Sequence, residues 1–284
     1  MRELLRWAVA AFEEVGIESA QLDAELLLAH ALGLSRTQLY TQLDRALERQ
    51  TEESFRELIS RRLGREPVAY ILGHKEFYGL DFQVDRRVLI PRPETETLVE
   101  VALTIARQRG LSLLAEVGVG SGAVAIALAI SLPEVEIYAI DSSSDGLDVA
   151  AENCRRHDVS DRVYLLHGDL LAPLPEPVEL IVANLPYVSM AELSTLAPEI
   201  TQYEPVGALD GGPDGLDQIR RLLEQAGPCL KPSGLLCLEI GATQALGVNQ
   251  LLRSQFPEAS VALVRDLGGL DRVVVASTGE RADA

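Results

Sequence analysis

The chain has 284 residues, 47% of them hydrophobic, and its 43 acidic and 25 basic residues give a formal net charge of -18. This is enough apolar material for a large core divided between two domains. The excess of acid argues against a nucleic-acid partner, which would need a basic surface, and the absence of a charge-free apolar stretch of about 20 residues leads us to expect no membrane span.

Residues 1–75 are predicted to form a small helical domain, because apolar residues recur there at the spacing of buried helix faces. The three stripes are Leu5, Ala8, Val9 and Phe12; Leu22, Leu26, Ala29 and Leu32, stopped by Gly33; and Phe55, Leu58 and Ile59, with Thr51 as the expected N-cap. Arginines near the third stripe are expected to form a solvated helix face paired with glutamates. The arginines are Arg56, Arg61, Arg62 and Arg65, and the glutamates are Glu52, Glu53 and Glu57.

Residues 76–92 alternate between apolar and polar positions around a Tyr78-Gly79 break, which predicts a hairpin linker between two domains. From residue 93 to residue 284, helical segments alternate with short apolar runs, as expected for a mostly parallel α/β sheet. The seven runs expected to form strands are 111–117, 135–140, 162–167, 178–183, 234–240, 260–264 and 272–276.

The turn after the first of these runs has the composition of a ligand-binding loop. Glu116 precedes three alternating glycines, which lead into an apolar helix; the turn itself comprises Gly118, Val119, Gly120, Ser121 and Gly122. Glycines adopt positive φ and let a ligand approach the backbone closely. Gly118, Gly120 and Ala123 also satisfy the dinucleotide fingerprint, so nicotinamide nucleotides and S-adenosylmethionine both remain candidates. The carboxylate of Glu116 favours S-adenosylmethionine, because it would repel a pyrophosphate but suits a cationic amino acid group.

Two further carboxylates follow the next apolar runs. Asp141 ends the second run at the distance from the glycines expected of a residue that accepts hydrogen bonds from both ribose hydroxyls. Asp169 follows the third run and could accept a hydrogen bond from the adenine amino group, with Leu170 against the ring. A carboxylate after a strand is also a common turn or cap residue, and for Asp169 taken alone both readings stay open.

The fourth run leads into Asn184-Leu185-Pro186-Tyr187, a turn suited to holding a planar NH2 group. The Asn184 side chain and the Leu185 carbonyl can both accept hydrogen bonds from one nitrogen, while the tyrosine ring covers the flat face of the group. A nitrogen held in this way can attack a methyl donor. Residues 184–216, rich in proline and glycine, are expected to roof this acceptor site.

These residues resemble a known family. Asn-Pro-Pro-Tyr is the usual catalytic motif of methyltransferases that act on amino groups, and the whole chain resembles the bacterial release factor glutamine methyltransferases, the PrmC or HemK family. Further blocks typical of that family cover nearly the whole chain, including its helical part. They are residues 66–73, 76–79, 90–96, 203–205, 208–209, 211–212, 214–216 and 266–269, together with Arg272.

The chain departs from the family pattern at three positions. Leu185 occupies the second position of the motif, where the family usually has proline; this keeps the carbonyl but loses the fixed φ. Glu116 and Val119 stand where aspartate and threonine are more common. Asn-Leu-Pro-Tyr is more typical of ribosomal RNA adenine dimethyltransferases, so an RNA adenine methyltransferase is the rival hypothesis. The other family blocks, residues 90–96 above all, and the negative net charge oppose it. A nicotinamide-dependent oxidoreductase would leave residues 184–187 unexplained, and a cofactor-binding scaffold without activity is possible if Leu185 disables the turn.

The resemblance implies a Rossmann-like, seven-stranded class I methyltransferase domain at 93–284, with its last strand antiparallel, preceded by a helical substrate-docking domain at 1–75. It implies methylation of the glutamine side-chain amide in the Gly-Gly-Gln motif of peptide chain release factors, with S-adenosylmethionine as cofactor and S-adenosylhomocysteine as product. Asn184 to Tyr187 would be catalytic, and Asn184 would also contact the cofactor. We expect a cytoplasmic monomer without a metal, because the histidines and cysteines have no metal-ligand spacing and the amino terminus lacks a secretory signal.

Overall fold

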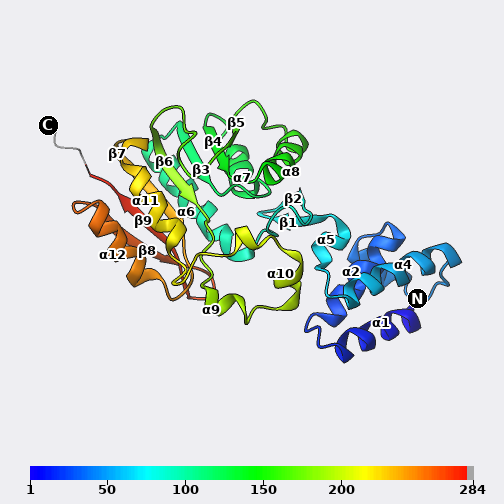
Figure 1. The fold of residues 1–284 in the computed structure, drawn as a ribbon. Helices are drawn as coiled ribbons and strands as arrows, with labels where there is room; N and C mark the ends of the chain where they lie inside the picture. The colour runs from blue at the N-terminus through cyan, green and yellow to red at the C-terminus, as the bar shows by residue number, and fades with distance from the viewer. Residues whose placement is uncertain (280–284) are drawn as a thin grey trace. The chain divides into compact units, whose positions relative to one another are not determined.

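The computed structural model describes residues 1–279, which form two compact units. The first unit contains residues 1–74 together with residues 197–203, and the second contains residues 75–196 and the chain from residue 204 onward. The return of residues 197–203 to the first unit was not among the sequence expectations. Figure 1 shows helices α1, α2 and α4 of the first unit in blue, its returning helix α10 in yellow, and the sheet of the second unit in green to red.

The first unit consists of helices around a core of its own. The helices are α1 (Arg2–Glu14), α2 (Ala20–Leu32), α3 (Arg36–Gln42), α4 (Arg49–Leu63), α5 (Val68–Leu72) and, from the returning segment, α10 (Pro198–Tyr203). Phe12, Leu27 and Phe55 are among its fully buried side chains, so α1, α2 and α4 all contribute to the core. The predicted stripes of α1 and α4 are confirmed at Leu5, Phe12, Phe55 and Ile59.

The second stripe was predicted only in part: Ala29 is buried and Leu32 packs against the core. Leu22 is 41% exposed, whereas Leu27 and Leu28 are fully buried. Helix α2 packs against α1, α3, α4 and α5, so it is buried on most sides and its apolar spacing does not select one face. Gly33 does end the helix, at φ +64°.

The Thr51 cap was also wrong, because α4 begins at Arg49 with Glu48 as N-cap. Arg49 and Glu53 form an i,i+4 ion pair that supports the extra turn. Among the arginines expected on a solvated face, Arg56 does pair with Glu52. Arg62 does not: it is only 4% exposed.

The linker hairpin is shorter than predicted and begins earlier. Its strands are β1 (His74–Phe77) and β2 (Leu80–Gln83), and residues 84–92 contain no strand. Tyr78 and Gly79 have φ values of +53° and +73°, the conformation of a two-residue turn that matches the twist of a hairpin. The alternation of residues 84–92 instead places Val84 and Val88 in the core.

The second unit contains a seven-stranded sheet, which confirms the predicted fold class. Its order is β5-β4-β3-β6-β7-β9-β8, and only β9 runs antiparallel to its neighbours. The strands are β3 (Leu113–Val117), β4 (Glu136–Asp141), β5 (Val163–His167), β6 (Val178–Ala183), β7 (Leu230–Glu239), β8 (Ser260–Arg265) and β9 (Asp271–Ser277). Strand β7 begins four residues before the predicted run, because Leu230 pairs with Val178 ahead of a register shift.

Helices cover the sheet (Figure 1), and their bounds complete the second unit. They are η1 (Pro93–Thr95), α6 (Glu96–Arg109), α7 (Ala123–Ser131), α8 (Ser144–Arg156), α9 (Met190–Leu193), η2 (Val206–Ala208), α11 (Asp217–Cys229) and α12 (Ala245–Gln255). From β3 the chain continues to β4 and β5 on one side of the sheet and then returns to β6 and β7 on the other. The switch point between β3 and β6 is where open α/β sheets bind ligands. In residues 1–279, no helix is long and apolar enough to cross a bilayer.

Candidate functional site

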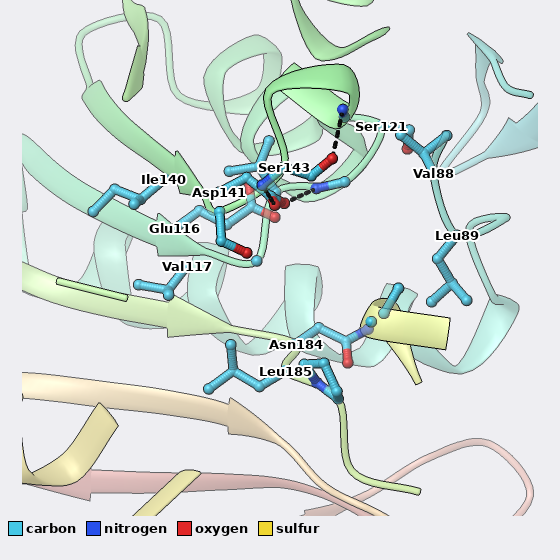
Figure 2. A pocket seen from close by; sticks show the side chains of 18 of the residues that line it. Val88, Leu89, Glu116, Val117, Ser121, Ile140, Asp141, Ser143, Asn184 and Leu185 are labelled. Atoms are coloured by element: carbon cyan, nitrogen blue, oxygen red, sulfur yellow. Dashed lines mark hydrogen bonds between the residues drawn. The ribbon is translucent and has the colours of Figure 1, made fainter. Parts of the chain in front are cut away.

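A cavity of about 390 Å³ lies at this switch point. In Figure 2, Glu116 and Asp141 lie at the ends of β3 and β4, and Asn184 and Leu185 lie across from them after the end of β6. Of the sequence-predicted site residues, those that line the cavity are Glu116, Gly118, Val119, Gly120, Ser121, Asp141, Asp169, Leu170, Asn184, Leu185 and Pro186. Gly122 and Tyr187 are not among the lining residues.

The turn after β3 needs glycine at Gly118, because a side chain there would collide with a neighbouring turn. At Gly118, φ is +82° and a Cβ would lie 3.0 Å from the Asn184 carbonyl oxygen. Any other residue would therefore be strained and would push the glycine turn and the Asn184 turn apart. Gly122, with φ +83°, is the N-cap of α7, so it shapes the turn without lining the cavity.

Glu116 is a buried carboxylate, 2% exposed, at the floor of the cavity. Its Oε2 accepts a hydrogen bond from the Ala125 N–H at 2.8 Å, which ties the end of β3 to α7. Burial raises the pKa of Glu116 to about 8, because the charged form loses its hydration. A cationic group placed beside it would favour the ionised form.

Asp141 organises the turns around it. Its Oδ2 accepts a hydrogen bond from the Gly120 N–H at 2.8 Å and its Oδ1 accepts one from the Ser143 N–H at 2.9 Å, both drawn in Figure 2. Each carboxylate oxygen can accept a second hydrogen bond. The role predicted for Asp141, accepting from a pair of ribose hydroxyls, is therefore compatible with its structural bonds.

Asp169 and Leu170 line the cavity after β5. The Oδ2 of Asp169 accepts a hydrogen bond from Arg221 Nη2 at 2.6 Å, so the carboxylate is held by α11. Leu170 is buried and has φ +50°, which is uncommon for a residue with a side chain and marks a constrained backbone. The adenine contacts predicted for these two residues stay a prediction.

The turn after β6 is held from several sides. Asn184 Nδ2 donates a hydrogen bond to Thr95 Oγ1 at 3.1 Å, so the amide NH2 faces the protein and Oδ1 is left for a ligand. Leu185 is 5% exposed and packs in the core of the sheet. Gln244 Nε2 donates to the Tyr187 carbonyl at 2.9 Å, which anchors the far end of the turn.

Tyr187 does not line the cavity and is held by a residue of β7. Its hydroxyl lies 3.4 Å from Glu239 Oε1, at the end of β7. Burial, and the nearby carboxylate of Glu239, raise the pKa of Tyr187 to about 12, so the hydroxyl stays protonated. Covering of a planar acceptor by this ring remains a prediction.

Residues missed by the sequence analysis complete the cavity. Thr95 and Arg92 line it from the block 90–96, which was noted as a family signature without a role. Arg92 Nη2 donates to Glu204 Oε1 at 2.5 Å and thereby holds the start of the segment whose Pro205, Gly207 and Ala208 line the cavity. Glu239, which does not line the cavity, ends β7 as Asp141 ends β4, and Glu116 is the last residue but one of β3; this shared pattern could have revealed Glu239.

Comparisons with known proteins agree with this architecture. A family model described as the PrmC N-terminal domain matches residues 3–73, and one described as a methyltransferase domain matches residues 114–207. A ribosomal protein L11 methylase from Lactobacillus delbrueckii subsp. bulgaricus superposes with a TM-score of 0.51 at 21% identity, covering 68% of this chain and 82% of its own. At that identity the match supports the fold alone.

Curated relatives match over almost the whole chain. The release factor glutamine methyltransferase of Geobacter sulfurreducens is 42% identical over 276 residues, which cover 96% of this chain and 95% of the relative. That of Rhodopirellula baltica is 40% identical over 280 residues, covering 95% and 94% respectively. Such identity across both units confirms the family resemblance found in the sequence, and the chain belongs to the release factor glutamine methyltransferase family.

Proposed function

We propose that this protein methylates the side-chain amide nitrogen of the glutamine in the Gly-Gly-Gln motif of peptide chain release factors, using S-adenosylmethionine. The observation that carries the proposal is the turn after β6, where Asn184 Oδ1 and the Leu185 carbonyl accept no hydrogen bond from residues 1–279 and lie next to the cavity. Full-length relatives named for this reaction support the same substrate.

The cavity fits S-adenosylmethionine at the glycine turn. Gly118 leaves room that a Cβ would fill, Glu116 provides a buried carboxylate for the cationic amino acid portion, and Asp141 provides acceptors for the ribose hydroxyls. When bound, the cofactor supplies a methyl carbon that the sulfonium has already activated, so that the new N–C bond forms as the S–C bond breaks and the sulfur keeps the electron pair.

The protein must make an amide nitrogen nucleophilic, although that nitrogen shares its lone pair with the neighbouring carbonyl. Asn184 Oδ1 and the Leu185 carbonyl would accept hydrogen bonds from its two N–H groups and favour pyramidal geometry, an effect that grows toward the transition state. One proton then leaves the nitrogen for water. Alignment of donor and acceptor can contribute roughly 7 to 11 kcal/mol in favourable cases.

The rival activities fit less well. RNA adenine methylation is opposed by the net charge of -18 and by the relatives' shared name, and an oxidoreductase leaves the Asn184 turn without a purpose. We also infer that the protein acts as a monomer in the cytoplasm, where its proposed substrates work, and without a nucleic-acid partner. Equilibrium sedimentation and an RNA-binding titration would test these inferences.

The direct test is transfer of labelled methyl from S-adenosylmethionine to a purified release factor. A release factor with the motif glutamine changed to alanine and ribosomal RNA serve as parallel acceptors. We expect label on the intact factor alone, and Asn184→Ala should abolish transfer while the protein stays folded. Label on RNA, or substantial activity in Asn184→Ala, would contradict the proposal.

A further inference from the structure

A polar stripe on α11 lies against the turn that follows β5. Gln218, Arg221 and Gln225 recur at positions i, i+3 and i+7, which places them on one face of the helix. The apolar residues of α11 pack in the same core cluster as Leu170 and Leu171 of the turn. Gln225 Oε1 accepts a hydrogen bond from the Leu171 N–H at 3.0 Å, so polar contacts also fasten the turn to the helix.

One guanidinium group joins this stripe to the carboxylate of Asp169. Arg221 Nη2 donates to Asp169 Oδ2 at 2.6 Å, and Arg221 Nη1 donates to Gln218 Oε1 at 3.0 Å. A guanidinium group has only donors and stays protonated, so both partners must meet it with an oxygen. This requirement fixes the orientation of the Gln218 amide, because its oxygen is engaged by Arg221 and its NH2 group is left for another partner.

The polar atoms that Arg221 does not engage are one acceptor and one donor beside the cavity. Gln218, Arg221 and Asp169 all line the cavity. Within residues 1–279, Gln218 Nε2 donates to no acceptor and Asp169 Oδ1 accepts from no donor. Since the two terminal nitrogens of one guanidinium group hold both side chains, the carboxylate and the amide are neighbours. Such a pair suits a ligand edge that presents a donor next to an acceptor.

Adenine has an edge of this kind. Its 6-amino group is a donor, and the nearest ring nitrogens on either side of that group, N1 and N7, are acceptors. Hypoxanthine has an oxygen in place of the amino group and therefore presents an acceptor where the Asp169 carboxylate needs a donor. The pair would thus bind adenosine in preference to inosine.

We propose that Gln218 is an adenine-binding residue of the cofactor site, which donates from its NH2 group to a ring nitrogen beside the 6-amino group. Arg221 is a positioning residue that holds the Gln218 amide and the Asp169 carboxylate next to each other. The inference rests on the proposed function only through its cofactor, S-adenosylmethionine. Neither residue of α11 was among the sequence expectations, because each is separated from Asp169 by about 50 positions.

Binding of product analogues tests the Gln218 contact without a release factor. The ligands are S-adenosylhomocysteine and its 1-deaza and 7-deaza analogues, in each of which C–H replaces one ring nitrogen, and titration calorimetry gives a Kd for each. We expect the loss of one of these nitrogens to weaken binding to the wild-type protein by roughly three- to tenfold. In Gln218→Glu, which keeps an oxygen for Arg221 but has no NH2 group, this loss should vanish. Gln218→Ala, which adds no charge, should abolish it as well.

Gln225→Glu is the matched control. It makes the same change on the same face of α11, keeps an oxygen for the Leu171 N–H, and affects a residue that does not line the cavity. The three Kd values should keep their wild-type ratios in this variant. If they also keep those ratios in Gln218→Glu, or if the wild-type protein binds all three ligands equally, the Gln218 contact is refuted.

Discrimination at position 6 of the purine tests Arg221. We expect the wild-type protein to bind S-inosylhomocysteine roughly tenfold to a hundredfold more weakly than S-adenosylhomocysteine. Arg221→Met removes both hydrogen bonds and should narrow this ratio. The variant should stay folded, because the side chains of Arg221 and Asp169 are 46% and 56% exposed and such pairs contribute little to stability. A ratio unchanged in Arg221→Met would show that Arg221 positions no adenine-binding group.

Arg220→Met is the control for this second measurement. Arg220 is the neighbouring residue of α11, pairs with Asp214 and Asp217, and does not line the cavity. The ratio of the two Kd values should therefore stay at its wild-type value. A ratio that narrows equally in both arginine variants would show that any loss of charge from α11 has this effect, and would overturn the role of Arg221.

The outcomes separate this inference from the proposed function. If the wild-type protein methylates no release factor but the Kd ratios respond as expected, the adenine contact stands and the proposed function fails. If the wild-type protein methylates the release factor and the ratios do not respond, the adenine contact is refuted and the proposed function stands.

Discussion

At the scale of single residues, the site contains two acids that the protein holds in their neutral form more readily than water would. Burial raises the pKa of Glu116 to about 8 and that of Glu239 to about 7. Neither acid has an ion-pair partner within salt-bridge distance in residues 1–279. The site is therefore built at a cost in stability, and this cost increases with pH.

Glu116→Gln should reveal that cost. Below pH 4.5, Glu116 of the wild-type protein is protonated in both the folded and the unfolded state. From pH 4.5 to about 8, only the folded state keeps the proton, so the unfolding free energy falls as the pH rises. Above pH 8 the unfolding free energy levels off. Each tenfold difference in proton affinity between the folded and the unfolded state changes the unfolding free energy by about 1.4 kcal/mol. Urea denaturation should show the variant gaining stability over wild type between pH 5 and pH 9.

The amide of the variant can still accept the Ala125 N–H, so packing is kept. Glu258→Gln, an exposed change, should follow the wild-type pH dependence and serves as the control. If the unfolding free energies of Glu116→Gln and wild type differ by the same amount at pH 5 and at pH 9, the explanation is contradicted.

At the scale of elements, the turn of residues 184–187, which we propose to be catalytic, depends on the segment that follows it. The Val188 carbonyl accepts a hydrogen bond from the Gly211 N–H at 2.9 Å, and Gln244 Nε2 donates to the carbonyls of Tyr187 and Gly215. Two parts of the proline- and glycine-rich stretch 184–216 thus have different roles. Residues 205–208 contribute to the cavity wall, and residues 210–215 support the Asn184 turn on the side away from the cavity.

Gly211→Ala should therefore impair catalysis. A Cβ at this position would lie 2.8 Å from the Pro186 carbonyl oxygen and from Tyr187 Cα, so the turn must shift. Such a displacement can cost roughly 100-fold in rate, and we expect this loss in kcat for methyl transfer with cofactor affinity nearly unchanged. Gly247→Ala is the control, because its Cβ would meet only the movable end of the Leu216 side chain. Equal activity of the two variants would show that the support is dispensable.

At the scale of the whole molecule, the chain returns to its helical unit after the Asn184 turn. Glu199 of α10 accepts hydrogen bonds from Arg62 Nη1 at 2.9 Å and from Arg65 Nη2 at 2.8 Å. Arg62 also donates to Asp23 at 2.8 Å, with both side chains nearly buried. Residues 197–203, which follow the Asn184 turn, are therefore held by Arg62 of α4 and by Arg65, two side chains that were predicted on a solvated helix face.

Arg62→Met should destabilise the protein by about 3 to 5 kcal/mol, because it leaves Asp23 and Glu199 without their shared partner in a buried setting. Denaturant unfolding followed by circular dichroism measures the change. Arg49→Met, on the same helix but in an exposed pair with Glu53, should have no measurable effect. Similar stability of both variants would show that the Arg62 network is energetically neutral.

The amino-acid sequence by itself determined the fold class, the family and part of the cavity wall, because these depend on local patterns. Apolar runs specify strands, alternating glycines specify a tight turn, and Asn184 to Pro186 follow a buried strand directly. Where many contacts compete, local patterns failed: α2 is buried on most sides and β7 gains residues by pairing with β6.

Only the tertiary structure brought together side chains that are far apart in the chain. Thr95 and Asn184 meet because η1 and β6 end at the same edge of the second unit, and Arg62 meets Glu199 because the chain returns to the first unit. A hydrogen bond between residues separated by about 90 positions, as between Thr95 and Asn184, leaves no periodicity in the sequence. The direction of the Asn184 amide, on which the proposed chemistry depends, was decided there.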